Sequence, residues 1–144
     1  MPLALVVDDD PVVREILRLI FEKSGWSVVE AMDARGGLDA FHSLTPQLVT
    51  LDLVMPINDG FGSVDLAQKI GDQAPNTIVV VVSAFGSEGE VRKFFHDREV
   101  PVLSKTSIDK SRLAELLMHL RTAFELDKSL KGAAFEDGEN GSIS

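Results

Sequence analysis

Short apolar stretches alternate with longer amphipathic segments along most of this chain. The apolar stretches are rich in β-branched residues and cover residues 3–7, 27–31, 47–53, 77–83 and 100–103. Within the fourth stretch, the run TIVVVV at 77–82 shows no polar alternation, which is typical of a strand covered on both faces of a sheet. These stretches predict five β-strands.

The segments between the strands carry apolar residues at helical spacing. Pro11 suits the first turn of a helix that ends near Gly25. Apolar residues mark the first four helices: Val13, Ile16, Leu17 and Ile20; Leu38 and Phe41, before Pro46; Phe61, Val64, Ala67 and Ile70, up to Gly71; and Val91, Phe94 and Phe95. A fifth helix has a continuous apolar stripe at Leu113, Leu116, Leu117, Leu120 and Phe124.

Strict alternation of five strands with five helices predicts an α/β fold, a single doubly wound parallel sheet with helices on both faces. We expect this domain to cover residues 1–126. Residues 127–144 are acidic, rich in glycine and poor in core residues, which predicts a disordered tail. In such folds ligands bind beyond the carboxyl ends of the strands, where the strand order reverses.

Polar side chains stand at the carboxyl ends of four of the predicted strands. The first strand ends at Asp8 and Asp9, the third contains Asp52, the fourth ends at Ser83, and the fifth is followed by Lys105. An unpaired Asp52 in an apolar run would be very costly to bury. With Lys105 and a cation nearby it can stay ionised, so the acids predict a metal site.

Oxygen ligands without any cysteine favour a hard divalent ion, Mg²⁺ or Mn²⁺. Phosphoryl transfer to a carboxylate uses this set of groups. An aspartate is the nucleophile, the metal neutralises developing charge, and the lysine and serine hold the phosphoryl oxygens.

The composition narrows the choice of function. The formal net charge is −9 over 144 residues, which disfavours a nucleic-acid-binding surface. The chain has no cysteine, which excludes disulfides and thiol chemistry and fits a cytoplasmic protein. Residues 3–7 are too short to insert into a membrane, lack a basic leader and run into acids, so they are not a signal peptide.

Four segments resemble the receiver domains of two-component response regulators, over roughly residues 3–126. LVVDDDP is similar to the acidic-pair motif, LDLVMPINDG to the phosphoacceptor motif, VVSA to the hydroxyl-bearing strand end, and LSK to the lysine motif. The resemblance implies a flavodoxin-like fold with strand order 2-1-3-4-5. It also implies phosphorylation of Asp52 by a histidine kinase or a histidine phosphotransfer protein.

The resemblance also assigns the other site residues. Asp9 would bind Mg²⁺ directly, Asp8 through water, and Val54 through its backbone carbonyl, with Asp52 completing the set. Ser83 would hydrogen-bond the phosphoryl group, and Lys105 would pair with it. The sequence departs from the family pattern after the lysine, where Thr106 replaces a proline, and at the aromatic switch position, which is Val102.

These features predict a stand-alone receiver that signals through contacts with an unidentified downstream protein and catalyses only its own phosphorylation and hydrolysis. One alternative is a phosphatase of the haloacid dehalogenase type, because DDDPV fits its opening motif; Asp52 would then have no role. Another is a binding module that keeps the site as a relic. Asp8 and Asp9 could also simply end a strand and cap a helix, the role we assign to Asp10. Ser83 and Lys105 could be an ordinary strand-end hydroxyl and a solvated lysine.

Overall fold

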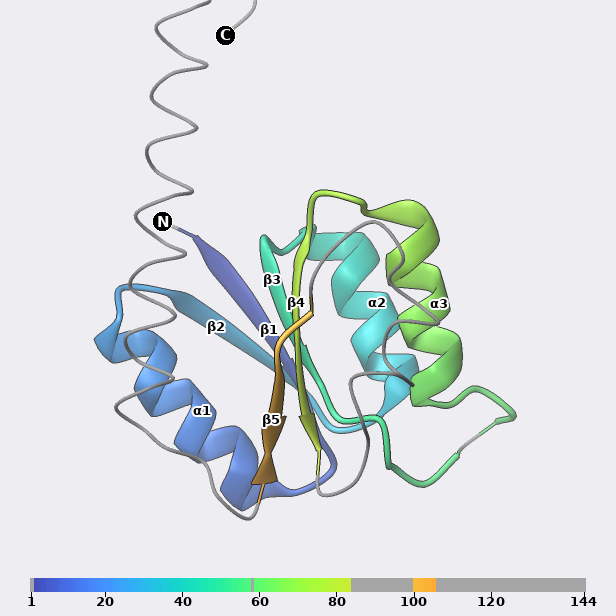
Figure 1. Ribbon diagram of the computed structural model, residues 1–144, viewed down its shortest axis with the longest axis horizontal. Helices are drawn as coiled ribbons and strands as arrows, with labels where there is room; N and C mark the ends of the chain where they lie inside the picture. Colours follow the sequence, from blue (N-terminus) through green and yellow to red (C-terminus); the bar gives the residue numbers. More distant parts are fainter. Residues whose placement is uncertain (1, 58, 84–99, 106–144) are drawn as a thin grey trace, which may run out of the picture.

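The computed structural model describes residues 2–57, 59–83 and 100–105, and these form a parallel sheet with helices on both faces (Figure 1). The strands are β1 (Leu3–Val7), β2 (Ser27–Ala31), β3 (Leu48–Leu51), β4 (Ile78–Ser83) and β5 (Val102–Ser104). Their order in the sheet is β2-β1-β3-β4-β5, and all neighbouring pairs are parallel. The predicted order is therefore confirmed.

Three helices are described: α1 (Pro11–Lys23), α2 (Ala34–Leu44) and α3 (Ser63–Gln73). The helix α1 covers one face of the sheet, and α2 and α3 cover the other (Figure 1). The predicted fourth and fifth helices and the predicted tail lie outside the described residues. No helix in the described ranges is long and apolar enough to cross a membrane.

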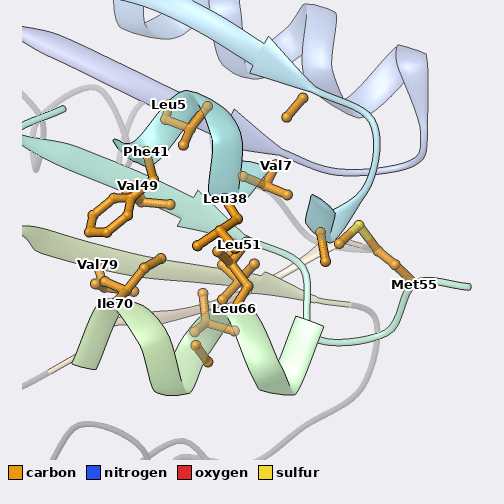
Figure 2. Close-up of a cluster of buried hydrophobic side chains, with 14 residues drawn as sticks. Leu5, Val7, Leu38, Phe41, Val49, Leu51, Met55, Leu66, Ile70 and Val79 are labelled. Carbon is orange, nitrogen blue, oxygen red and sulfur yellow. The ribbon is translucent and has the colours of Figure 1, made fainter. Parts of the chain in front are cut away.

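Alternation along β1 divides the core between the two faces. Ala4 and Val6 pack with the buried residues of α1, whereas Leu5 and Val7 pack with α2 and α3. Figure 2 shows the second cluster, in which Phe41 of α2 and Ile70 of α3 lie against the sheet. A Cβ at Gly37 would lie 3.0 Å from Leu66 of α3 and 3.1 Å from Val7 of β1, so a glycine lets α2 approach both α3 and the sheet closely.

The central strands are buried on both sides. Val79, Val80, Val81 and Val82 of β4 are at most 2% exposed. The unbroken apolar run of this strand predicted that both of its faces are covered. The structure confirms this prediction, because both faces of β4 are removed from water. This burial leaves the carboxyl ends of the strands as the place where polar side chains gather.

Local capping explains where α1 and α2 begin. The Asp10 carboxylate accepts a hydrogen bond from the Val12 amide at 2.9 Å, and Pro11 occupies the first turn. Asp33 caps α2 in the same way through the Gly36 amide at 2.7 Å. The capping role predicted for Asp10 is confirmed.

The prediction for the third helix was wrong at both ends. Phe61 precedes α3, which begins at Ser63 because the Asp65 carboxylate accepts a hydrogen bond from the Gly62 amide and closes the first turn. The helix runs through Gly71 to Gln73. Val64 is 45% exposed, and Leu66 is one of the residues that face the core instead.

Three strand predictions also needed shorter or shifted bounds, of which the smallest change is in β4, which begins at Ile78 and not at residue 77. β3 ends at Leu51, so Asp52 follows the strand instead of lying inside it. β5 begins at Val102, two residues after the apolar run begins, and ends at Ser104, one residue after that run ends. An apolar pattern alone does not mark where strand pairing begins and ends, so these bounds differ from the predicted ones by one or two residues.

Candidate functional site

The sheet brings the first and third strand ends side by side. Val7 pairs with Leu51 in register, so the residues that follow them, Asp8 and Asp52, are neighbours. The Asp52 amide continues the ladder by donating to the Val7 carbonyl at 3.2 Å. Both carboxylates therefore lie just beyond the carboxyl ends of these two neighbouring strands. The predicted pairing of these acids is thus a product of strand order.

Lys105 reaches this pair from β5, two strands beyond β3. Its ammonium nitrogen Nζ donates to Asp52 Oδ2 at 2.6 Å and to Asp8 Oδ1 at 3.0 Å. The lysine side chain is 16% exposed, whereas Asp8 and Asp52 are 2% and 1% exposed. One cation therefore bridges two buried carboxylates, and the reading of Lys105 as a solvated surface lysine is wrong.

Burial shifts the pKa of Asp8. Burial raises the pKa of the Asp8 carboxyl above its ordinary value of 3.8, and the negative charge of Asp52 acts in the same direction. Hydrogen bonds from the Asp10 amide and from Lys105 oppose this rise without cancelling it. Burial is therefore the main reason why the pKa of Asp8 is raised.

The pKa of Lys105 is shifted by its burial and by the same two acids. Burial by itself lowers the pKa of this ammonium, but the hydrogen bonds and charges of Asp52 and Asp8 outweigh burial and raise it above 10.5. Lys105 is therefore cationic throughout the physiological range of pH.

The third acid, Asp9, completes a group suited to a cation. One carboxylate oxygen each from Asp8, Asp9 and Asp52 lie within 4.8 Å of one another. Asp9 is exposed, so the group opens to solvent on one side. Asp8 Oδ2 is buried and has no hydrogen-bond partner in the described part of the chain. A buried carboxylate oxygen without a partner, beside two further carboxylates, fits an oxygen-preferring ion such as Mg²⁺.

The loop after β3 orients Asp52. The Val54 amide donates to Asp52 Oδ1 at 2.9 Å, while Lys105 holds the other oxygen, Oδ2. The Val54 side chain is 55% exposed beside the site. The structure thus places Val54 next to Asp52, and the ligand role of its carbonyl stays a prediction.

The remaining predicted positions are only partly described. Ser83 is the last residue of β4 and pairs with Ser104 of β5, which puts it at the same edge of the sheet. Its side chain, like Thr106, lies outside the described residues. Val102 begins β5 and packs, partly buried, against the cluster on the α2–α3 side of the sheet. A core-packed valine thus occupies the position where the family carries its aromatic switch.

One contact at this site was missed from the sequence. The Arg14 guanidinium donates through Nη1 to the Asp8 backbone carbonyl at 2.7 Å. Its only sequence signal is an arginine in the first turns of the helix that follows the acids, and this signal is too common to be specific.

Comparisons with known proteins agree with this geometry. The family model described as "Response regulator receiver domain" matches residues 4–118. Chemotaxis protein CheY of Thermotoga maritima is 34% identical over 88 residues, which cover 60% of this chain and 71% of that protein. Protein-glutamate methylesterase/protein-glutamine glutaminase 3 of Hahella chejuensis is 34% identical over 84 residues, 56% of this chain and 23% of that protein. The chain spans less than two thirds of the length of several curated relatives.

A solved structure of a response regulator protein has a similar fold. Response regulator protein TrrA of Thermotoga maritima, in complex with Mg(2+)-BeF, superposes with a TM-score of 0.68 at 25% identity, covering 83% of this chain and 99% of that one. Receiver domains bind Mg²⁺ at an aspartate cluster, and Asp8, Asp9 and Asp52 form such a cluster here. The family match covers most of the chain, and the strand order and acid cluster agree with it. The chain therefore belongs to the response regulator receiver domains, the phosphoacceptors of two-component signalling.

Proposed function

We propose that Asp52 is the phosphoacceptor of this receiver. The observation that carries the proposal is a carboxylate 1% exposed, held on Oδ2 by Lys105 and on Oδ1 by the Val54 amide. Two fixed hydrogen bonds hold the carboxylate in one orientation, which favours an in-line approach of one oxygen to phosphorus. The phosphoryl donor is a phosphohistidine on a histidine kinase or a histidine phosphotransfer protein.

In the transfer, an Asp52 oxygen bonds to phosphorus as the nitrogen–phosphorus bond of phosphohistidine breaks. The leaving imidazole keeps the bonding electron pair and takes a proton from solvent. Lys105 stays protonated and moves its hydrogen bond from the carboxylate to a phosphoryl oxygen, with the Ser83 hydroxyl as a further donor. When bound, Mg²⁺, or Mn²⁺ in its place, would supply positive charge that neutralises charge on the phosphoryl oxygens.

The metal ligands we propose are Asp9 directly, Asp8 through water, Asp52, and the Val54 carbonyl. The unpartnered Asp8 Oδ2 supports a polar occupant on that side of the site. We also propose that residues 1–126 form the receiver, with 127–144 as a tail, and that the exchange takes place in the cytoplasm. The signal is a change in affinity for a downstream protein, and the chain catalyses no reaction beyond its own phosphorylation and hydrolysis.

The competing functions lack a supporting observation. In a phosphatase of the haloacid dehalogenase type, Asp8 would be the nucleophile and Asp10 the acid, but Asp10 caps α1 through Val12. A relic site could keep the lysine bridge for its stability alone, so a labelling experiment has to separate a relic from a working acceptor.

Labelling with acetyl phosphate separates the three functions. We expect one stable label per chain with Mg²⁺ and none after EDTA, because the developing charge needs the metal. The bond should break with hydroxylamine, as an acyl phosphate does. Rapid multiple turnover would indicate a phosphatase, and complete absence of label with Mg²⁺ present would indicate a relic.

Mg²⁺ alone should stabilise the unphosphorylated protein. Binding to the folded state offsets the repulsion among the acids and raises the melting temperature as the Mg²⁺ concentration rises. Asp9→Ala should remove most of this shift, whereas the exposed Asp39→Ala on α2 should keep it. Differential scanning calorimetry over a Mg²⁺ series measures both. An Asp9→Ala protein that responds like the wild type would place the ion elsewhere.

A further inference from the structure

Arg14 lies on α1 and hydrogen-bonds both a residue of β2 and the first acid of the site. Its Nη1 donates to the Asp8 carbonyl oxygen at 2.7 Å, and its Nε donates to Glu30 Oε1 at 3.1 Å. The Arg14 side chain is 18% exposed and that of Glu30 29%. Arg14 therefore uses two donors of its planar guanidinium on two different partners.

Glu30 is itself held in place. Its other oxygen, Oε2, accepts from Arg18 Nε at 2.7 Å. Its backbone is in β2, paired in register with Val6, two residues before Asp8. The carboxylate that orients Arg14 is thus fixed by a strand on one side and by a second arginine on the other.

The carbonyl that Arg14 binds belongs to the peptide joining Asp8 to Asp9. Because a peptide unit is planar, a hydrogen bond that fixes the carbonyl of Asp8 also fixes the amide of Asp9 and the direction of its Cα. A bond of 2.7 Å from a charged donor is a strong restraint. The other side of this turn is restrained by the Asp10 amide, which donates to Asp8 Oδ1 at 2.9 Å.

Asp9 has few restraints of its own. Its side chain is exposed and makes no hydrogen bond within residues 2–57, 59–83 and 100–105. Its carboxylate nevertheless lies with those of Asp8 and Asp52 in the acid cluster. The backbone before Asp9 must therefore supply the orientation that its side chain lacks.

We propose that Arg14, held by Glu30, is a positioning residue that directs the Asp9 carboxylate toward the Mg²⁺ site. It acts through the Asp8–Asp9 peptide and touches neither the metal nor the phosphoryl group. The proposal rests on the metal site described under the proposed function. The proposal predicts weaker Mg²⁺ binding when Arg14 is removed. Electrostatics alone predicts the opposite, because an arginine near a dication repels it and its removal would tighten Mg²⁺ binding.

The test is a calorimetric titration of the full chain with Mg²⁺ in the absence of any phosphodonor. Arg14→Ala should weaken Mg²⁺ binding about tenfold, the usual effect of losing a group that orients a metal ligand. Arg14→Lys keeps the charge but not the planar fork, so it should weaken binding as well. A wild-type Kd in Arg14→Lys, or a wild-type or tighter Kd in Arg14→Ala, would overturn the proposal.

Lys23→Ala is the matched control. Lys23 lies on the same helix and carries the same charge, but it is exposed in the last turn and makes no hydrogen bond or ion pair with Glu30 or Asp8 in the described part of the chain. It should leave the Kd unchanged or slightly lower. Urea unfolding in EDTA gives the second readout. A purely structural role would make Arg14→Ala lose stability while the folded protein binds Mg²⁺ like the wild type, and that result would also overturn the proposal.

Asp9→Ala separates this proposal from the one beneath it. If Asp9→Ala binds Mg²⁺ like the wild type, the proposed metal site is wrong, and Arg14 has no ligand to position. If Asp9→Ala loses binding while Arg14→Ala keeps it, the metal site stands and only the positioning role is wrong. Loss of binding in both, with Lys23→Ala unaffected, supports both.

Discussion

Asp52→Asn should abolish stable phosphorylation of the chain by acetyl phosphate. The amide keeps the shape of the side chain but lacks the nucleophilic carboxylate, so no acyl phosphate can form. The fold should persist and become somewhat more stable in EDTA, since the change relieves repulsion between Asp52 and the neighbouring Asp8. Intact-protein mass spectrometry measures the label, and urea unfolding measures the stability.

Asp39→Asn provides the control for this variant, because Asp39 is an exposed aspartate on α2, away from the strand ends. It should take up label like the wild type. Full labelling of the Asp52→Asn protein, at the site or elsewhere, would contradict the assignment of the acceptor.

Lys105→Met should lower the free energy of unfolding by about 3 kcal/mol at neutral pH in EDTA. The change leaves two carboxylates, 1% and 2% exposed, without their shared cation, and breaking a buried ion pair has a cost of this order. Lys69→Met removes the same charge from an exposed position on α3 and should change stability by less than about 0.5 kcal/mol.

The loss in Lys105→Met should depend on pH in a defined direction. In the wild type the raised pKa of Lys105 means that its stabilising contribution is complete below pH 10.5 and disappears as pH rises through the folded-state pKa. The difference between wild type and variant should therefore close at alkaline pH. It should also close in acid, where the Asp8 carboxyl, whose pKa is raised, becomes protonated.

Denaturant unfolding across this pH range measures the difference. Adding Asp52→Asn to Lys105→Met should recover part of the lost stability, because one of the two unpaired charges is gone. A Lys105→Met protein as stable as Lys69→Met at neutral pH would show that the bridge contributes nothing net.

Much of the fold could be predicted from the residues, because the pattern of apolar and polar residues in each element reflects which of its faces is buried. β1 and β2 have the bounds that their apolar runs predicted. Asp10 and Pro11 mark the start of α1 by capping chemistry that needs no distant partner. The third helix was misplaced because Phe61 fits the apolar period, whereas the Asp65–Gly62 hydrogen bond decides the first turn.

The sequence by itself determined that Asp8, Asp9, Asp52 and Lys105 gather in one place, because the carboxyl ends of parallel strands meet at the same edge of the sheet. Only the tertiary structure decided how they meet. Lys105 bonds partners 97 and 53 residues away, Asp8 is more buried than Asp9 beside it, and Arg14 contacts the Asp8 carbonyl. The physical reason is that distances, burial and the resulting pKa shifts depend on strand order and helix packing, which bring together residues whose separation along the chain carries no such information.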